Sequence, residues 1–181
     1  MVGVLCVAAS VAGAEPTASR GLVPAAAFGV WRTMLITRPD AMPRARALAY
    51  SVRRDAYMAV DFVAPLCTHE VSFVTPLNRP AERSLAIPLQ YAFRVDQNRV
   101  YRFNGKTELT MGDLAAQLSV ISTPALADVI NEMKYGQVLR IEFAAVQSRT
   151  GPGYMTYPLA GFAQAVSRAI DMCRKASANV L

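Results

Sequence analysis

Apolar residues near the C-terminus recur with the period of an α-helix. Between residues 157 and 175 they are spaced three and four positions apart: Leu159, Phe162, Val166, Ala169, Ile170 and Cys173. This spacing places them on one helical face, while Asp171 and Lys175 lie on the other at a distance suited to an i,i+4 ion pair. The pattern therefore predicts an amphipathic C-terminal helix, which must pack against an apolar surface.

Apolar and polar residues in the middle of the chain alternate with the period of a β-strand. The clearest stretches are 57–66, 87–95 and 138–146, and the stretch 28–37 with the only tryptophan is a further strand candidate. Within 57–66 we expect Leu66 to share the buried face and Asp61 to lie on the opposite one. Asn104-Gly105, between 98–103 and 106–110, is typical of a two-residue hairpin turn.

A short helix is predicted between these strands. Thr123 is suited to cap it, Pro124 to its first position and Gly136 to its end. Strands dominate and the helices come late, so the sequence predicts an α+β class with an antiparallel sheet or sandwich-like core. The helix over 124–135 and the C-terminal helix pack on that core. We expect a single α+β domain over 28–181, preceded by a loosely ordered tail over 15–27.

The first fourteen residues are typical of an export signal. An apolar run from Val2 to Val11 precedes Ala12-Gly13-Ala14, an A-x-A cleavage pattern. A positive region after Met1 is missing, so either the start lies upstream or the signal is atypical. The run is too short for a transmembrane anchor, which needs about 20 apolar residues. The sequence therefore predicts a signal peptide over 1–14 and a periplasmic or secreted protein.

Export determines how the cysteines are interpreted. Cys6 would leave with the signal, so Cys67 and Cys173 remain as an even pair. In an oxidising compartment such a pair most often forms a disulfide, and Cys173 lies on the apolar face of the predicted helix. Two separate buried thiols are the alternative.

Charge and composition narrow the function classes. The chain has a formal net charge of +6, but Arg44, Arg46, Arg53 and Arg54 are its only local basic cluster. No basic motif interleaved with aromatic residues accompanies them, so we expect no specific nucleic-acid binding. Scattered basic residues are better explained by a solvated face.

Residue types that carry chemistry are few. His69 is the only histidine in the sequence. Cys67-Thr68-His69-Glu70 is the one compact group that suggests either a thiolate activated by the neighbouring imidazole or part of a metal site. Asp128 and Glu132 are spaced to share a metal on the predicted helix, although a solvated face explains them better. A separate group of tyrosines could form a sheet-side surface for a partner, although tyrosines in strands usually just pack: Tyr91, Tyr101, Tyr154 and Tyr157. We expect no catalytic, cofactor-binding or metal site.

The order of these segments resembles a known family. An early Trp31, Val95-Asp96, Gly136-Gln137-Val138-Leu139 and the segment from Tyr157 to Phe162 are similar to the small exported proteins of the invasion-associated locus B type from proteobacteria. The resemblance implies a β-sandwich-like exported protein without a known catalytic mechanism. The expected function is thus a non-enzymatic accessory or binding protein of the bacterial envelope with an unknown protein or envelope partner. The alternative is a small thiol-dependent enzyme or redox protein using Cys67 and His69.

Overall fold

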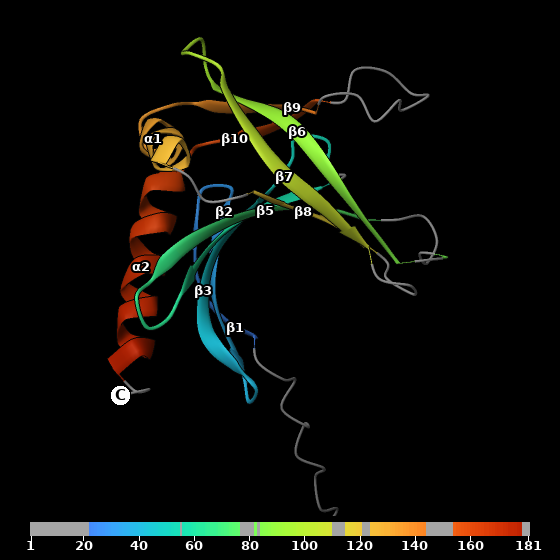
Figure 1. Ribbon diagram of the computed structural model, residues 1–181. Coiled ribbons are helices and arrows are strands. Elements are labelled where there is room, and N and C mark those ends of the chain that lie inside the picture. The colour runs from blue at the N-terminus through green and yellow to red at the C-terminus, as the bar shows by residue number, and fades with distance from the viewer. Residues whose placement is uncertain are drawn as a thin grey trace, which may run out of the picture.

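Antiparallel strands form the framework of the computed structural model, which describes residues 22–54, 56–76, 82, 84–109, 115–120, 124–143 and 154–178. Within them, ten strands are β1 (Leu22–Phe28), β2 (Trp31–Arg38), β3 (Ala41–Tyr50), β4 (Tyr57–Val63), β5 (Thr68–Pro76), β6 (Leu85–Val95), β7 (Tyr101–Leu109), β8 (Ala115–Val120), β9 (Val138–Phe143) and β10 (Tyr154–Pro158). Hydrogen bonds connect them in the order β1-β2-β3-β4-β5-β8-β7-β6-β9-β10. Two helices, α1 (Pro124–Met133) and α2 (Phe162–Ala178), complete the α+β fold (Figure 1).

The sheet folds over so that its two halves face each other. Phe73 in β5 contacts Phe93 in β6 and Tyr157 in β10, with ring centroids 5.5 and 5.9 Å apart, although neither strand neighbours β5. All three rings are essentially buried. Opposed apolar faces of this kind produce the predicted sandwich-like core.

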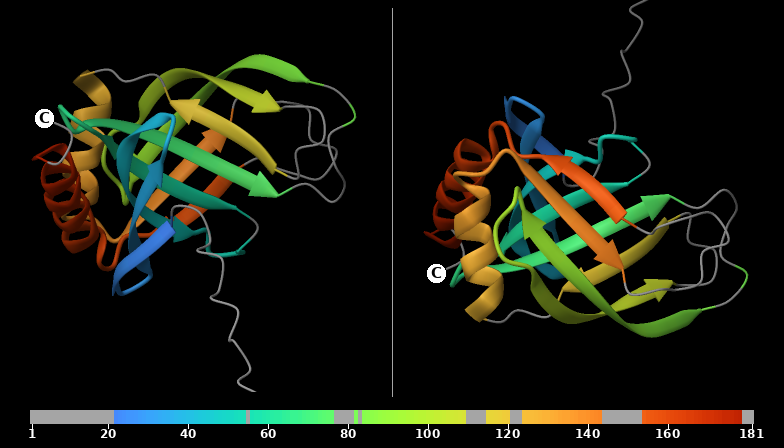
Figure 2. Two further views of the ribbon diagram at one scale, coloured as in Figure 1. Left: turned by 90° about the horizontal axis from the view of Figure 1, so that it is seen from below. Right: turned by 90° about the horizontal axis from the view of Figure 1, so that it is seen from above.

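Both helices lie at the same end of the folded sheet (Figure 2). Helix α2 packs on β1 to β4, and its Phe162 ring meets Trp31 edge-on with centroids 4.7 Å apart. Helix α1 packs on β6 and buries the predicted face: Leu126, Val129, Ile130 and Met133. The amphipathic pattern of the C-terminal helix is therefore confirmed, with Val166, Ala169 and Cys173 buried and Asp171 and Lys175 exposed.

The turn before α2 is in backbone contact with the turn between β1 and β2. Gly29 and Gly161 have φ angles of +57° and +91°, which favour glycine. A methyl group on Gly161 would overlap the carbonyl oxygen of Phe28. Trp31 donates its indole Nε1–H to the carbonyl of Pro158 at 3.0 Å. These contacts fix α2 against the first two strands.

The predicted hairpin turn at Asn104-Gly105 is wrong. Strand β7 runs straight through both residues, and Gly105 pairs with Leu89 on one side and Val120 on the other. The chain turns instead after β6, at Asp96, whose φ is +48°. Aspartate tolerates this conformation, and its carboxylate can accept hydrogen bonds from nearby backbone groups. Asp96 can therefore form a turn as readily as Asn-Gly can.

The carboxylate of Asp96 also holds the start of β9. It accepts hydrogen bonds from the backbone N–H of Gln137 at 3.0 Å and of Val138 at 2.9 Å. Gly136 packs so closely on this turn that a methyl group there would overlap Val95. Two segments that carried the family resemblance, 95–96 and 136–139, are thus partners in one structural contact.

Two expectations at strand ends need correction, and one at the N-terminus lies outside the described residues. Residues 22–27 belong to β1 and not to the loosely ordered tail expected over 15–27, because they pair with β2. Leu66 is 83% exposed because β4 ends at Val63 and a turn follows. The signal peptide over 1–14 and residues 15–21 lie outside the described part of the chain.

Candidate functional site

A disulfide joins Cys67 and Cys173, as the cysteine pattern predicts. Cys67 lies in the turn between β4 and β5 with a φ of +52°, and its Cα is 5.9 Å from that of Cys173 in α2. The nearby Ser177 hydroxyl contacts the carbonyl of Pro65 at 3.1 Å and that of Cys173 at 2.8 Å. The bridge and this hydroxyl attach the C-terminal half of α2 to the sheet.

The Cys67-Thr68-His69-Glu70 group is not assembled as a catalytic site. The sulfur of Cys67 is bonded to Cys173, and the carboxylate of Glu70 lies 2.8 Å from Nη1 of Arg44. His69 lies opposite Phe62 in the sheet, and its buried Nε2 has no hydrogen-bond partner among the described residues. Because its sulfur is in the disulfide, Cys67 offers no free thiol to the imidazole in this arrangement.

A buried carboxylate on β4 was not anticipated as a charge centre. Asp61 is only 2% exposed. Arg46 donates two hydrogen bonds to its carboxylate, from Nε to Oδ1 at 2.6 Å and from Nη2 to Oδ2 at 2.8 Å. Arg44 adds a third at 2.9 Å. Burial of Arg46 lowers the pKa of its guanidinium, but the charges and hydrogen bonds of Asp61 and Tyr57 outweigh this and raise it. Asp61, Arg46 and Arg44 form a structural ion cluster, since their charged groups are hydrogen-bonded to one another.

The local basic cluster in the sequence is thus divided by the fold. Arg44 and Arg46 neutralise Asp61, whereas Arg53 is exposed in the turn after β3. The signal for the ion cluster was the placement of Arg46 and Asp61 at positions that become register partners in β3 and β4. Strand register follows from the whole hairpin, so spacing alone did not reveal it.

The acidic residues of α1 bind protein groups rather than one another. Asp128 pairs with Arg99 at 3.0 Å, and Glu132 accepts hydrogen bonds from Tyr101 at 2.5 Å and from Asn98 at 3.1 Å. Burial, and next the hydrogen bond to Glu132, raise the pKa of Tyr101. Throughout the described residues, no group of three or more His, Cys, Asp or Glu side chains is placed to hold a metal ion.

Of the four tyrosines that could form a sheet-side surface, three pack in the core instead, as tyrosines in strands usually do. Tyr91, Tyr101 and Tyr157 are 2%, 6% and 0% exposed because strand alternation points them into the core. Tyr154 alone is on the surface, at 49% exposure. Elsewhere Tyr50 is also exposed, at the end of β3.

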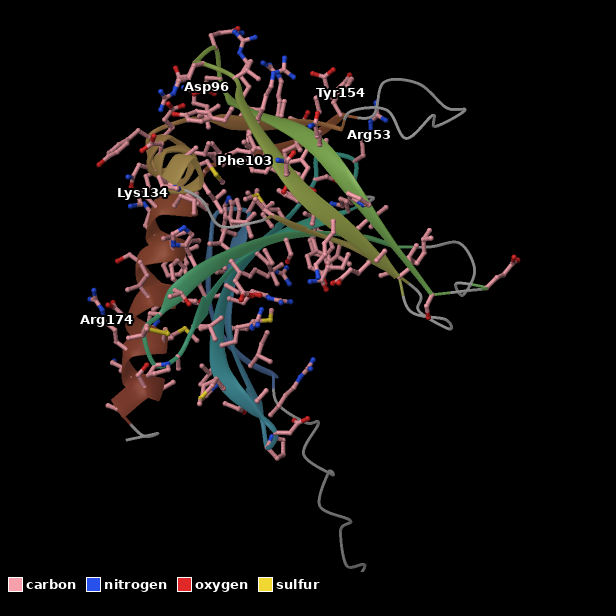
Figure 3. All side chains as sticks on the ribbon, viewed as in Figure 1. Arg53, Asp96, Phe103, Lys134, Tyr154 and Arg174 are labelled. Atoms are coloured by element: carbon pink, nitrogen blue, oxygen red, sulfur yellow. A yellow bond between two sulfur atoms is a disulfide. The ribbon has the colours of Figure 1, made fainter. Side chains whose placement is uncertain are left out.

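Tyr154 borders a pocket between the turn after β3 and the edge strand β10. The pocket measures about 220 Å³ and is lined by Ser51, Val52, Arg53, Tyr154, Met155 and Thr156. The backbone N–H of Val52 donates to the carbonyl of Thr156 at 2.8 Å and joins the two walls. Figure 3 shows Arg53 and Tyr154 close together, far from Arg174 on α2.

Arginines continue outward from this pocket across the sheet. Thr156 lies opposite Arg140 in β9, which lies opposite Arg94 in β6. In the next row, Tyr154 lies opposite Glu142, which lies opposite Ala92 in β6. Ala92 in turn lies opposite Arg102 in β7. We call this surface the β9–β10 face; its residues are Arg53, Arg94, Arg102, Arg140, Glu142, Tyr154 and Thr156. It is the best candidate for a binding site in the described part of the chain.

The alternating pattern of β9 already placed Arg140 and Glu142 on an outward face. What the sequence did not indicate is that β9 pairs with β6 and β10, which brings Arg94 and Tyr154 beside them.

No helix in the part of the chain that the structure describes is long and apolar enough to cross a membrane. No protein-family model, curated protein or solved structure matches the chain.

Proposed function

We propose that the protein is an exported binding or accessory protein of the bacterial envelope, without catalytic activity of its own. The observation that carries this proposal is the Cys67–Cys173 disulfide. Such bonds persist in oxidising compartments and are rare where thiols are kept reduced. The A-x-A pattern at Ala12-Gly13-Ala14 points to the same compartment.

The binding role is supported by how the polar residues are used. Charged side chains beneath the surface are engaged within the fold, as with Asp61 and Arg46. The β9–β10 face, by contrast, presents charged and aromatic side chains to solvent beside a pocket. Exposed arginine and tyrosine together are typical of protein-binding surfaces.

The thiol-dependent alternative has less support. A nucleophilic cysteine must be free and ionised, whereas the sulfur of Cys67 is in a disulfide. The bridge closes a long loop onto the buried face of α2, which is typical of a structural bond. The two cysteines are also far from the C-x-x-C spacing of redox proteins.

The resemblance to invasion-associated locus B proteins agrees with a scaffold role. The residues behind it make contacts that hold the fold, such as Trp31 with Pro158 and Asp96 with Gln137. We therefore propose that the chain is a relative of this type.

Cell fractionation followed by N-terminal sequencing tests the proposal. Expressed in a Gram-negative host, the protein is expected in the periplasmic fraction or the medium, with its N-terminus at or near Glu15. Replacing Ala14 by a bulky residue should block processing, since the cleavage position needs a small side chain. Full-length chain in the cytosol would contradict export.

A further inference from the structure

The β9–β10 face carries an excess of positive charge that is not neutralised by ion pairs among the described residues. Four guanidinium groups (Arg53, Arg94, Arg102 and Arg140) share it with the single carboxylate of Glu142. None of the four forms an ion pair with a carboxylate of the described residues. The ion pairs of the described chain lie elsewhere, around Asp61, α1 and Lys106.

Two of these arginines oppose each other directly. Arg94 and Arg140 are cross-strand partners, a placement that destabilises a sheet when both side chains carry the same charge. Arg94 is restrained by the Gln97 carbonyl at 3.2 Å and the Asn98 carbonyl at 3.1 Å, and Arg140 contacts the Asp96 carbonyl at 3.4 Å. These neutral groups hold the guanidinium groups without cancelling their charge, so an incoming anion would relieve the repulsion.

The pocket gives this charged face a place to anchor a side chain. Arg53 and Tyr154 stand at its walls, and Thr156 lies between the pocket and Arg140. An aromatic ring beside an arginine at a concave site is the composition of interface hot spots. Val52, which is 65% exposed, adds an apolar side chain to the lining of the pocket.

We propose that the β9–β10 face binds an acidic segment of a protein partner. A carboxylate enters the pocket beside Arg53, and further carboxylates lie over Arg140 and Arg102. An extended segment suits the face because its alternate side chains point the same way at intervals of about 7 Å, which matches the spacing of successive outward-facing rows along a strand. The inference rests on the proposed function and specifies the chemistry of its partner.

An anionic membrane is the less suitable occupant. Lipid-surface binding uses clusters of about 4–8 Lys or Arg, with apolar side chains that insert between headgroups. Here Glu142 lies next to Arg140 on the outward face of β9, in the row that ends at Arg102, and would repel phosphate groups. The largest exposed side chain at the pocket is a tyrosine. A peptide can avoid Glu142 by presenting an uncharged residue there, which a lipid surface cannot do.

An NMR titration of the purified, oxidised protein tests this inference. The probe is a short peptide of alternating Glu and Ser with blocked ends, and its Lys–Ser counterpart is the control ligand. At about 20 mM salt, where screening is weak, the acidic peptide should shift the amide resonances of residues 51–54, 140–142 and 154–156, and the basic peptide should not. Raising the salt above about 0.3 M should weaken binding, because screening shortens the reach of exposed charges.

Matched variants make the result specific. Arg140→Gln and Arg53→Gln should each raise the Kd by about three- to fivefold, and the double variant by about tenfold, as expected for exposed ion pairs. Arg174→Gln removes an exposed charge on α2, far from the face. It should leave the Kd within about twofold. Arg140→Lys keeps the charge and should retain most of the affinity.

Three outcomes would overturn the inference. They are no shifts with the acidic peptide, an equal loss of affinity in Arg174→Gln, or Arg140-dependent binding to phosphatidylglycerol vesicles without binding to the peptide. The titration uses purified, folded protein in vitro, so a negative result leaves the export proposal intact. Conversely, a cytosolic location would contradict export without changing the peptide result.

Discussion

Reducing the Cys67–Cys173 bond should destabilise the protein by several kcal/mol. The bridged residues are 106 positions apart. The chain-entropy relation for a loop of that length gives about 4.8 kcal/mol near room temperature, and loss of native disulfides typically costs about 2–5 kcal/mol. Because whole domains are stable by only about 5–15 kcal/mol, the bond is a large part of the total.

The assay is urea unfolding of the oxidised protein, the same protein reduced, and a Cys67→Ala, Cys173→Ala variant. With a urea dependence of about 2 kcal/mol per molar, the midpoint should fall by about 2 M on reduction. Cys173 is 1% exposed. The double variant should therefore fall at least as far, since truncating a buried side chain leaves a small cavity.

Hydrogen exchange locates the loss. Amides in the second half of α2 should lose protection first, because the bridge and Ser177 attach that half to the turn at Pro65. A midpoint that moves by less than about 0.5 M, corresponding to about 1 kcal/mol, would refute the reasoning. Unchanged protection of α2 after reduction would refute it as well.

Three further predictions concern single side chains and are checked by urea unfolding. Asp61→Asn leaves two arginines facing a neutral group. It should cost about 2–4 kcal/mol. Glu70 is the matched control, because its side chain is 54% exposed. Glu70→Gln should cost less than about 1 kcal/mol, and an equal loss in both variants would contradict the ion-cluster interpretation. Gly161→Ala places a methyl group over a carbonyl oxygen of β1 at a φ of +91°. Strain of this kind should cost about 2–3 kcal/mol. An unchanged free energy of unfolding in that variant would show that the contact is not tight. Tyr101→Phe loses the hydrogen bond to Glu132. The loss should cost about 1–2 kcal/mol at neutral pH. The pKa of Tyr101 is raised in the folded state. Its contribution is therefore fully present below about pH 10 and is lost as pH rises further, so stability measured between about pH 9 and about pH 11 should fall less in the variant.

Local patterns in the sequence predicted much of the fold because they depend on a single element. The apolar face of α2, and the apolar face of α1 that begins after Pro124, specify each helix without reference to its partners. The disulfide was also predictable, since Cys173 had to lie on the buried face of α2 and Cys67 was the only other cysteine outside the predicted signal segment.

Features that depend on distant strands were not predictable in this way. Asn104-Gly105 has the composition of a turn, yet Gly105 is held between two paired strands and Asp96 makes the turn instead. The preference of Asn-Gly for a turn is overridden because β7 is paired on both sides, and this pairing outweighs the propensity of a dipeptide.

The candidate site illustrates the same limit. Arg94, Arg140 and Tyr154 are each unremarkable in the sequence, and only the order β6-β9-β10 places them on one surface. The tyrosine surface failed for the converse reason. Tyr91 and Tyr157 sit at inward positions of strands whose facing direction depends on how the sheet folds over.

The redox state of the two cysteines inside the cell tests the central proposal most directly. Cells expressing the full chain are quenched in acid, and thiols are alkylated with one isotopic form of N-ethylmaleimide before reduction and with a second form afterwards. We predict that Cys67 and Cys173 carry only the second label, in a chain whose N-terminus lies at or near Glu15. First-label modification of both cysteines in folded, unprocessed protein would contradict an exported disulfide-bonded scaffold and favour the thiol-dependent alternative.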